Sequence, residues 1–453
     1  MEQLTPQKIA EITGGKYIGD ESARGIRVAG AARDNREIKP GNLFVCIRGA
    51  RVDGHDFAGK AYESGAVCCL AERELSNAQG PYVFVRSTLE AIKAVGKYYR
   101  NLFNIPVIGI TGSVGKTTAK EMTAAALGAK FNVLKTPENL NNELGVPLTL
   151  LSLDARHEAA VIEMGISEFG EMSRLAEMVR PDICVMTKIG YSHLEALGDL
   201  SGVLQAKSEV FAFMKPDGVA ILNGDDELLR EYDPGMRKIT FGLESYNDFH
   251  AENIRAVGTD AVMFNIISDT GSFPVKIPAY GSHLTPAALA AAAVGRRLGM
   301  TDDEICGGFL AYESVDGRAN VVDTGFITLI DDCYNANPNS VRAALTSLST
   351  FTGRRVAILG DMFELGEQSE QLHREIGTFA AHSGVDSLIC CGDKAVYMYE
   401  GYLSAGGDNI WYFPLKAELI TALPELIEKN DAVLVKASHG MQFEEILPHL
   451  KKI

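Results

Sequence analysis

Residues 111–118, Thr-Gly-Ser-Val-Gly-Lys-Thr-Thr, have the composition and spacing of a phosphate-binding loop. Glycines let the backbone approach a phosphate, successive N–H groups then point at the anion, and the N-terminus of the following helix adds positive potential. In such a loop, Lys116 would contact the β- and γ-phosphates and Thr117 would bind Mg²⁺. A strict Walker A motif has glycine five residues before Gly115, where this chain has Ile110. We interpret the loop as a variant; the alternative is a tight turn with an exposed lysine.

A carboxylate, Glu163, ends the apolar segment 159–163, Ala-Ala-Val-Ile-Glu. The carboxyl ends of parallel strands line the crevice in which ligands bind, so Glu163 is predicted to face the phosphate loop. A carboxylate in that place can hold the Mg²⁺ that accompanies a nucleoside triphosphate. The alternative is a glutamate at a strand end that simply reaches solvent.

Two further residues, His193 and Lys207, stand out from their surroundings. His193 follows the next predicted strand, which favours a place at the same crevice over the usual structural or solvated histidine. Lys207 lies on the apolar face of a predicted helix near 200–214. The other residues of that face are Leu200, Val203, Leu204, Phe211 and Met214. Most such lysines extend to water. The alternative is that a neutral Lys207 reacts with CO₂ to form a carbamate, an anionic oxygen ligand for a second metal ion.

The segments that must position these residues predict an α/β fold with three domains. After Pro106, near-continuous runs of Val, Ile and Ala alternate with helical stretches, which is typical of a parallel sheet covered on both faces. We expect a small mixed α/β N-terminal domain at 1–101, a central P-loop domain with a parallel sheet flanked by helices at 102–317, and a C-terminal Rossmann-like α/β domain at 318–453. The predicted strands are 107–111, 159–164, 183–187, 219–223, 327–331, 356–360, 388–392 and 432–436. The alternating segment 251–277 predicts a small antiparallel appendage.

Composition excludes several classes of function. The chain has 453 residues and a formal net charge of −16, which repels phosphate backbones and argues against a nucleic-acid partner. Hydrophobic residues make up 46%, as in a globular protein, and no apolar run is long enough to span a membrane. The N-terminus lacks the basic and apolar regions of a signal peptide, and the eight cysteines form no CxxC motif. We therefore expect a cytoplasmic protein with reduced thiols, and a monomer.

Taken together, these motifs are similar to those of the Mur ligase family, and the resemblance covers nearly the whole chain. It is strongest to the members that add D-alanyl-D-alanine to UDP-N-acetylmuramoyl-tripeptide. The segments that carry it are TGSVGKTT (111–118), ENLNNELGVPLTLL (138–151), VIEMG (161–165), IGYSHLEALG (189–198), DGR (316–318), DDCYNANPNSV (331–341), LGDMFELGE (359–367) and VKASHGM (435–441), with DNR (34–36), GNLFVCIRG (41–49) and DGHDF (53–57) in the N-terminal block.

The resemblance implies roles for individual residues. The catalytic residues would be Lys116, Glu163, His193 and Lys207. A first Mg²⁺ would be bound by Thr117 and Glu163, and a second by His193 and a carbamylated Lys207. ATP would be held by Gly112, Ser113, Val114, Gly115, Lys116, Thr117 and Thr118, and from the C-terminal side by Arg318, Asp332, Asn335 and Asn337. The UDP end of the substrate would contact Asp34, Asn35 and Arg36, and its peptide Asn139, Asn141 and Asn142.

Two positions depart from the pattern of the family. The family usually has His-Asn-x-x-Asn before an Ala-rich helix, with both amides at the adenine end of ATP, whereas this chain has Leu284 and Ala287 after His283. How adenine is held is therefore open. The usual Lys-Gly-Ser-Arg near the C-terminus is here Lys436-Ala-Ser-His439, which replaces a fixed charge by a group that titrates near neutrality.

The implied reaction is ATP-dependent ligation through an acyl-phosphate, with UDP-N-acetylmuramoyl-tripeptide and D-alanyl-D-alanine as substrates. Phosphoryl transfer needs positioning and charge neutralisation rather than a side-chain nucleophile, and the chain has no Ser/His or Cys/His motif. Two alternatives stay open: another amide ligase of the superfamily, such as a folylpolyglutamate-synthase-like or diaminopimelate-adding enzyme, and a P-loop NTPase that ligates nothing. The sequence does not distinguish L-lysine from meso-diaminopimelate as the third residue of the tripeptide.

Overall fold

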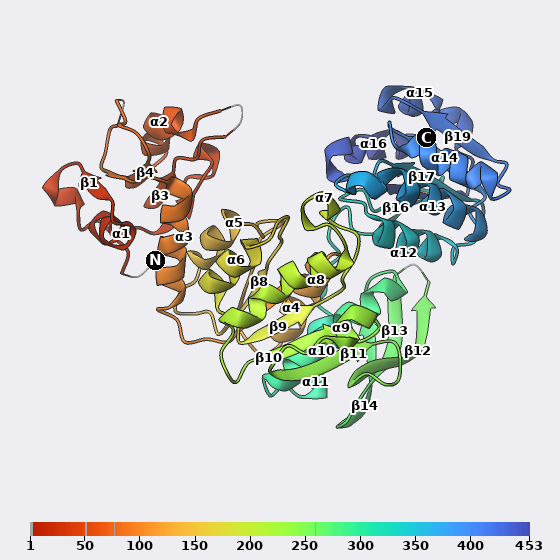
Figure 1. Ribbon diagram of the computed structural model, residues 1–453, viewed down its shortest axis with the longest axis horizontal. Helices are drawn as coiled ribbons and strands as arrows, with labels where there is room; N and C mark the ends of the chain where they lie inside the picture. Colours follow the sequence, from red (N-terminus) through yellow and green to blue (C-terminus); the bar gives the residue numbers. More distant parts are fainter. Residues whose placement is uncertain (1–2, 50–51, 77, 259) are drawn as a thin grey trace.

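The computed structural model describes residues 3–49, 52–76, 78–258 and 260–453, and they form three units, each built on one sheet (Figure 1). The expected α/β class with three sheets is confirmed. Within these ranges, no helix combines the length and the apolar character needed to cross a membrane. All eight cysteines are free thiols.

The N-terminal sheet has five strands in the order β1-β5-β4-β3-β2, with β1 antiparallel and the others parallel to their neighbours. Its strands are β1 (Lys16–Ile18), β2 (Gly30–Ala32), β3 (Asn42–Val45), β4 (Cys68–Ala71) and β5 (Tyr82–Phe84), and its helices are α1 (Pro6–Thr13) and α2 (Ala58–Glu63). Helix α3 (Thr88–Arg100) begins at this sheet, capped by Ser87, and packs on α5 (Gly145–Leu150) and α6 (Glu171–Val179) of the central unit. An ion pair of 2.6 Å between Lys97 and Glu177 reinforces that contact.

The central sheet has nine strands in the order β14-β13-β12-β11-β10-β9-β6-β8-β7. They are β6 (Val107–Thr111), β7 (Val133–Lys135), β8 (Ala159–Glu163), β9 (Ile183–Met186), β10 (Val219–Asn223), β11 (Arg237–Gly242), β12 (Phe249–Val257), β13 (Ala261–Ser268) and β14 (Gly271–Ile277). The pairs β12–β13 and β13–β14 are antiparallel, as the alternating pattern predicts, but they extend the parallel sheet by pairing β12 with β11. The appendage is therefore continuous with the central sheet.

Both faces of the central sheet are buried, which explains its continuous apolar strands. Along β8, Ala160 and Ile162 face one core, whereas Ala159 and Val161 face the other. Helix α4 (Lys116–Gly128) packs against the Ala-rich α10 (Thr285–Arg297) and α11 (Asp302–Phe309). The helix predicted near 200–214 differs: α8 (Leu200–Ser208) ends early and continues as a 3-10 helix, η4 (Glu209–Phe213).

The C-terminal sheet has six strands in the order β15-β16-β20-β17-β18-β19, all parallel except β15. Its strands are β15 (Asn320–Asp323), β16 (Thr328–Asp331), β17 (Arg355–Gly360), β18 (Ser387–Cys391), β19 (Ile410–Phe413) and β20 (Ala432–Lys436). Its helices are α12 (Pro338–Leu348), α13 (Ser369–His382), α14 (Ala395–Ser404), α15 (Lys416–Leu426) and α16 (Leu447–Leu450). The short helix α7 (Leu194–Leu197) of the central unit lies at the boundary with this unit (Figure 1).

Candidate active site

The phosphate loop connects β6 to α4 and depends on two glycines. Gly112 has φ 142° and Gly115 has φ 83°, backbone conformations that favour glycine. A Cβ on Gly112 would lie 2.0 Å from Oγ1 of Thr187, so the close approach also excludes a side chain. Ile110, at the position of the first Walker A glycine, is fully buried in β6. The connection between β6 and α4 is therefore residues 112–115, and it begins directly after the strand.

The segment that follows β9 holds the loop in place. The backbone N–H of Ser113 donates to the carbonyl of Lys188 at 2.7 Å, and the hydroxyl of Thr187 donates to the carbonyl of Val114 at 2.6 Å. Among the described residues, no side chain caps the N-terminus of α4, which follows this loop. An uncapped helix N-terminus of this kind binds anions well.

Lys116 is the first residue of α4, and its ammonium donates to the carbonyl of Gly112 at 2.9 Å. Burial lowers the pKa of Lys116; the nearby carboxylate of Glu163 raises it, and the guanidinium of Arg318 lowers it. The ammonium is thus poorly compensated by the protein, and an anion in the crevice would stabilise its charge.

Glu163 ends β8 at the carboxyl edge of the sheet and is 1% exposed. Its Oε1 accepts a hydrogen bond from Nδ2 of Asn141 at 2.7 Å, and the Lys120 ammonium lies 4.0 Å from Oε2. Oε2 is buried, and no group in the described part of the chain donates a hydrogen bond to it. A buried carboxylate oxygen without a partner is costly unless a cation occupies the space beside it. Glu163 therefore fits the requirement for a Mg²⁺ ligand.

His193 and Lys207 approach the crevice from α7 and α8. His193, with φ 54°, precedes α7, and its Nδ1 lies 2.7 Å from Oε2 of Glu364 in the C-terminal unit. Lys207 is 1% exposed, so it does not extend to water. Burial holds the pKa of Lys207 well below 10.5; Lys116 lowers it as well, whereas Glu171 raises it. Among the described residues, no cluster of three or more His, Cys, Asp and Glu side chains could hold a metal ion.

The C-terminal unit brings Arg318 onto the phosphate loop. Nη2 of Arg318 donates to Oγ1 of Thr117 at 3.3 Å, and its guanidinium lies 3.9 Å from the centroid of the Tyr334 ring. Nε of Arg318 is buried, and none of the described groups accepts its proton. Asp332 makes a 2.7 Å ion pair with Lys436. Arg318 is therefore positioned to add positive charge where the loop binds anions.

Several predicted asparagines have structural partners. Asn335 accepts a hydrogen bond from the N–H of Ala336 at 2.9 Å, and Asn337 caps α12. Asn142 accepts from the N–H of Gly145 at 2.9 Å, at the start of α5. Asn141 is bonded to Glu163, as described above. Asn339, which our sequence analysis did not single out, accepts from the N–H of Tyr191 at 3.1 Å and thus joins the C-terminal unit to the central one.

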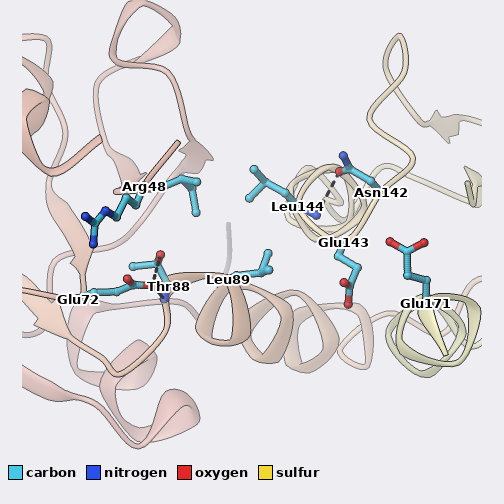
Figure 2. Close-up of a pocket in the computed structure, with 9 residues that line it drawn as sticks. Arg48, Glu72, Thr88, Leu89, Asn142, Glu143, Leu144 and Glu171 are labelled. Carbon is cyan, nitrogen blue, oxygen red and sulfur yellow. Dashed lines mark hydrogen bonds between the residues drawn. The ribbon is translucent and has the colours of Figure 1, made fainter. Parts of the chain in front are cut away.

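A pocket of about 380 Å³ lies between the N-terminal and central units. Figure 2 shows Arg48, Glu72 and Thr88 on one side of it and Asn142, Glu143 and Glu171 on the other. Its remaining lining residues are Ile47, Leu89 and Leu144. Glu171 begins α6, which packs against α8, the helix that carries Lys207. The sequence analysis assigned no role to Glu143 or Glu171. Arg48 and Glu143 belong to the segments 41–49 and 138–151 that it quoted, whereas Glu171 belongs to none of them.

The predicted UDP contacts lie outside this pocket, whose described lining does not include residues 34–36. Asp34 caps the 3-10 helix η2 (Asn35–Glu37) and accepts hydrogen bonds from the Arg36 side chain, which lowers the pKa of Asp34 to about 2. The two positions that lack the usual asparagines lie in the apolar core. Leu284 and Ala287 are buried in the core around α10 and present no polar side-chain atom.

Comparison with known proteins gives one consistent result. Family models described as Mur ligase family, catalytic domain; Mur ligase middle domain; and Mur ligase, glutamate ligase domain match residues 27–100, 110–295 and 317–439. UDP-N-acetylmuramoyl-tripeptide–D-alanyl-D-alanine ligase of Escherichia coli (strain K12) is 36% identical over 459 residues, which cover 100% of this chain and 99% of the relative.

Two solved structures are similar over most of their length. MurF from Acinetobacter baumannii has a TM-score of 0.89 at 30% identity and covers 99% of both chains. MurF ligase from Thermotoga maritima, solved in complex with ADP, has a TM-score of 0.83 at 28% identity and covers 94% of this chain and 98% of its own. The likeness therefore extends over all three sheets.

The burial of Lys207 predicts a pH-dependent cost to stability. In the unfolded chain its pKa is near 10.5, whereas in the folded protein it is much lower. Unfolding therefore takes up a proton at intermediate pH, so the cost is fully present below the folded pKa and disappears as pH rises through 10.5. We expect Lys207→Met, in buffer free of CO₂, to raise the free energy of unfolding at pH 7 and to raise it less at pH 10.

Urea denaturation at several pH values measures this difference. Lys39→Met, at an exposed lysine, is the control and should change stability little at any pH. A stabilisation by Lys207→Met that stays constant from pH 7 to 10 would contradict the buried, easily deprotonated lysine.

Proposed function

The chain belongs to the Mur ligase family, and we propose that it uses ATP to join D-alanyl-D-alanine to the peptide carboxylate of UDP-N-acetylmuramoyl-tripeptide. The observation that carries this proposal is the full-length likeness to enzymes named UDP-N-acetylmuramoyl-tripeptide–D-alanyl-D-alanine ligase. All three units of the chain have a counterpart in those enzymes, so none is left for a different activity. The product is a precursor of peptidoglycan, so the protein serves cell wall synthesis.

ATP is the nucleotide that residues 112–118 would hold, with Arg318, Asp332, Asn335 and Asn337 on the C-terminal side. The complex of the T. maritima ligase with ADP supports this assignment. The poorly compensated ammonium of Lys116 and the unpartnered Nε of Arg318 support it independently, because both groups gain a counter-charge when phosphate is bound.

The reaction follows from the weakness of a carboxylate as an electrophile. The γ-phosphoryl group of ATP passes to an oxygen of the tripeptide carboxylate, and ADP leaves. The amine of D-alanyl-D-alanine then attacks the acyl carbon and loses a proton, the C–O bond to phosphate breaks, and inorganic phosphate leaves. Lys116 and Arg318 stabilise the charge on the phosphoryl group during transfer. Closure of the C-terminal unit keeps water from the acyl-phosphate.

Thr117 and Glu163 would hold one Mg²⁺, and His193 and a carbamylated Lys207 a second. Held by these residues, Mg²⁺ would supply positive charge against the phosphates during transfer. The unpartnered Oε2 of Glu163 supports the first assignment. The lowered pKa of the buried Lys207 supports the second, because CO₂ reacts with the neutral amine.

The pocket between the N-terminal and central units suits the tripeptide, whose reacting carboxylate must reach the phosphoryl group. Arg48 and the segment 139–142 would contact the peptide, and residues 34–36 the UDP end. We place the domains at 1–101, 102–317 and 318–453. Helix α3 ends at Arg100, and Arg318 is the first residue of the C-terminal unit and contacts Thr117 of the central unit. We further propose that the enzyme acts in the cytoplasm, where ATP is available, and as a monomer.

The proposal is tested by supplying purified protein with ATP, UDP-N-acetylmuramoyl-tripeptide and D-alanyl-D-alanine. We expect phosphate release to require both the UDP substrate and the dipeptide, and mass spectrometry to detect the UDP-pentapeptide. Parallel reactions with L-lysine and meso-diaminopimelate at the third position identify the natural tripeptide. Hydrolysis without either substrate would favour a non-ligating NTPase, and use of a single amino acid would favour another amide ligase.

Lys116→Ala is expected to abolish ligation, because it removes the positive charge that stabilises the transferring phosphoryl group. The fold should stay intact, because the substitution removes no packing contact. Steady-state rates and circular dichroism measure the two effects. Lys130→Ala, just after α4 and paired with Glu304 at the surface, is the matched control. A variant at position 116 that keeps more than about a tenth of the wild-type rate, a loss of only ~1.4 kcal/mol, would show that the lysine lacks this role.

The apolar residues at 284 and 287 predict weak discrimination between ATP and GTP. A site without buried donors and acceptors for a base edge loses little when the wrong base binds. Values of kcat/KM for the two nucleotides should therefore differ by less than about 10³-fold, or ~4 kcal/mol. A larger preference for ATP would mean that other residues recognise adenine.

Lys207→Ala should lose ligase activity, and acetate should partly restore it by placing a carboxylate in the vacated space. Lys207→Arg fills that space with a fixed charge, so acetate should not rescue it. Rates with and without acetate check both variants, and ¹³CO₂ NMR detects the carbamate in the wild-type protein. Full activity of Lys207→Ala without acetate would exclude the carbamate.

A further inference from the structure

The ion pair between His193 and Glu364 joins the central unit to the C-terminal unit. Nδ1 of His193 lies 2.7 Å from Oε2 of Glu364. His193 immediately precedes α7, whereas Glu364 lies between β17 and the 3-10 helix η6 (Gly366–Gln368). The two residues are 171 positions apart in the sequence, so their contact depends entirely on how the two units meet.

Both residues have an unusual backbone conformation. His193 has φ 54° and Glu364 has φ 62°, in the left-handed region that residues with a side chain seldom adopt. The nearby Gly366 lies against α7, since a Cβ on it would be only 3.5 Å from the Cα of Glu195. Strain of this kind persists where the surroundings impose it, often at functional sites. Here it aims two side chains at each other across a domain boundary.

A second contact steadies the same segment. Oδ1 of Asn339 accepts a hydrogen bond from the N–H of Tyr191 at 3.1 Å. Gly190 lies close to the same oxygen, since a Cβ on Gly190 would be 2.7 Å from Oδ1 of Asn339. Two side chains of the C-terminal unit thus hold residues 190–193. Asn339 fixes the backbone of this segment, and Glu364 fixes the imidazole.

The chemistry of a metal-binding imidazole explains why a carboxylate is useful there. Such a ring offers one nitrogen to the metal and usually donates the N–H of the other to a carboxylate or carbonyl, which sets both the tautomer and the ring orientation. With Nδ1 of His193 directed at Glu364, the nitrogen left for a cation is Nε2. Glu364 is 57% exposed and contributes little to any core.

We propose that Glu364 is a positioning residue for His193, holding its imidazole with Nε2 free for the second cation while the C-terminal unit is closed. The inference rests on the proposed function, because it takes His193 as a ligand of that cation. The inference connects the cation site to the position of the C-terminal unit. The imidazole of His193 is correctly oriented only when that unit brings the carboxylate of Glu364 next to it.

The test compares Glu364→Ala and Glu364→Gln with Glu367→Ala, at an exposed glutamate of the adjacent 3-10 helix η6. Hydrogen exchange of residues 190–197 in protein without metal or nucleotide measures whether the segment loosens. Electron paramagnetic resonance of Mn²⁺, titrated in the presence of a non-hydrolysable ATP analogue, measures the cation sites. We expect Glu364→Ala to speed exchange in this segment and to weaken one Mn²⁺ site on the order of tenfold, as for other partners of metal ligands.

Glu364→Gln should retain much of the Mn²⁺ affinity, because an amide oxygen still accepts the proton of Nδ1. In a His193→Ala background, Glu364→Ala should have no further effect on Mn²⁺. If Glu364→Ala matches Glu367→Ala in both exchange and Mn²⁺ binding while the wild-type protein ligates normally, this inference alone is overturned. A wild-type protein that does not ligate would instead overturn the proposed function, and the exchange comparison would still be informative.

Discussion

The site depends on one constraint, the burial of an incompletely paired carboxylate at the end of β8. Glu163 has a hydrogen bond on one oxygen and, within the described part of the chain, no donor on the other, so its surroundings must be held firmly. The buried ammonium of Lys120 does much of this, because it donates to the carbonyls of Thr136 at 2.8 Å and Glu138 at 3.2 Å while lying 4.0 Å from Oε2. The N–H of Glu163 in turn donates to Oγ1 of Thr136 at 2.9 Å. The loop 136–142 is thereby attached both to the helix of the phosphate loop and to the strand that carries the carboxylate.

Local patterns predicted the scaffold well, because each depends on neighbours in sequence. The strands 107–111, 219–223 and 432–436 have the predicted bounds, since continuous apolar runs need only a two-faced sheet to bury them. Lys207 could also be singled out, because a charge on an apolar helical face is visible in the sequence. The end of α8 at Ser208 was missed, since the following turn tightens to a 3-10 helix without a proline or glycine to signal it.

Contacts between distant segments could not be predicted in the same way. Asn141 has the residue type of a substrate contact, yet its amide is bonded to Glu163, a pairing 22 residues apart that no spacing rule indicates. Asn339 and Glu364 belong to segments that the family resemblance included, but their partners lie in another unit. Glu143 was overlooked as well; its carboxylate lies between Lys93 of α3 and Arg174 of α6. In each case the residue type is ordinary, and only the meeting of two units gives it a role.

The N-terminal and C-terminal units are attached to the central one by different means. Helix α3 begins at the N-terminal sheet and packs along α5 and α6, with Lys93 and Lys97 paired to glutamates of the central unit. The C-terminal unit, in contrast, meets the crevice through polar side chains such as Arg318 and Glu364. An α-helix resists bending and stretching far more than a set of side-chain contacts does. Helix α3 therefore sets the spacing between the N-terminal sheet and the central unit. With the UDP end held at the N-terminal unit as proposed, only a substrate of matching length would place its acyl end at the phosphate loop.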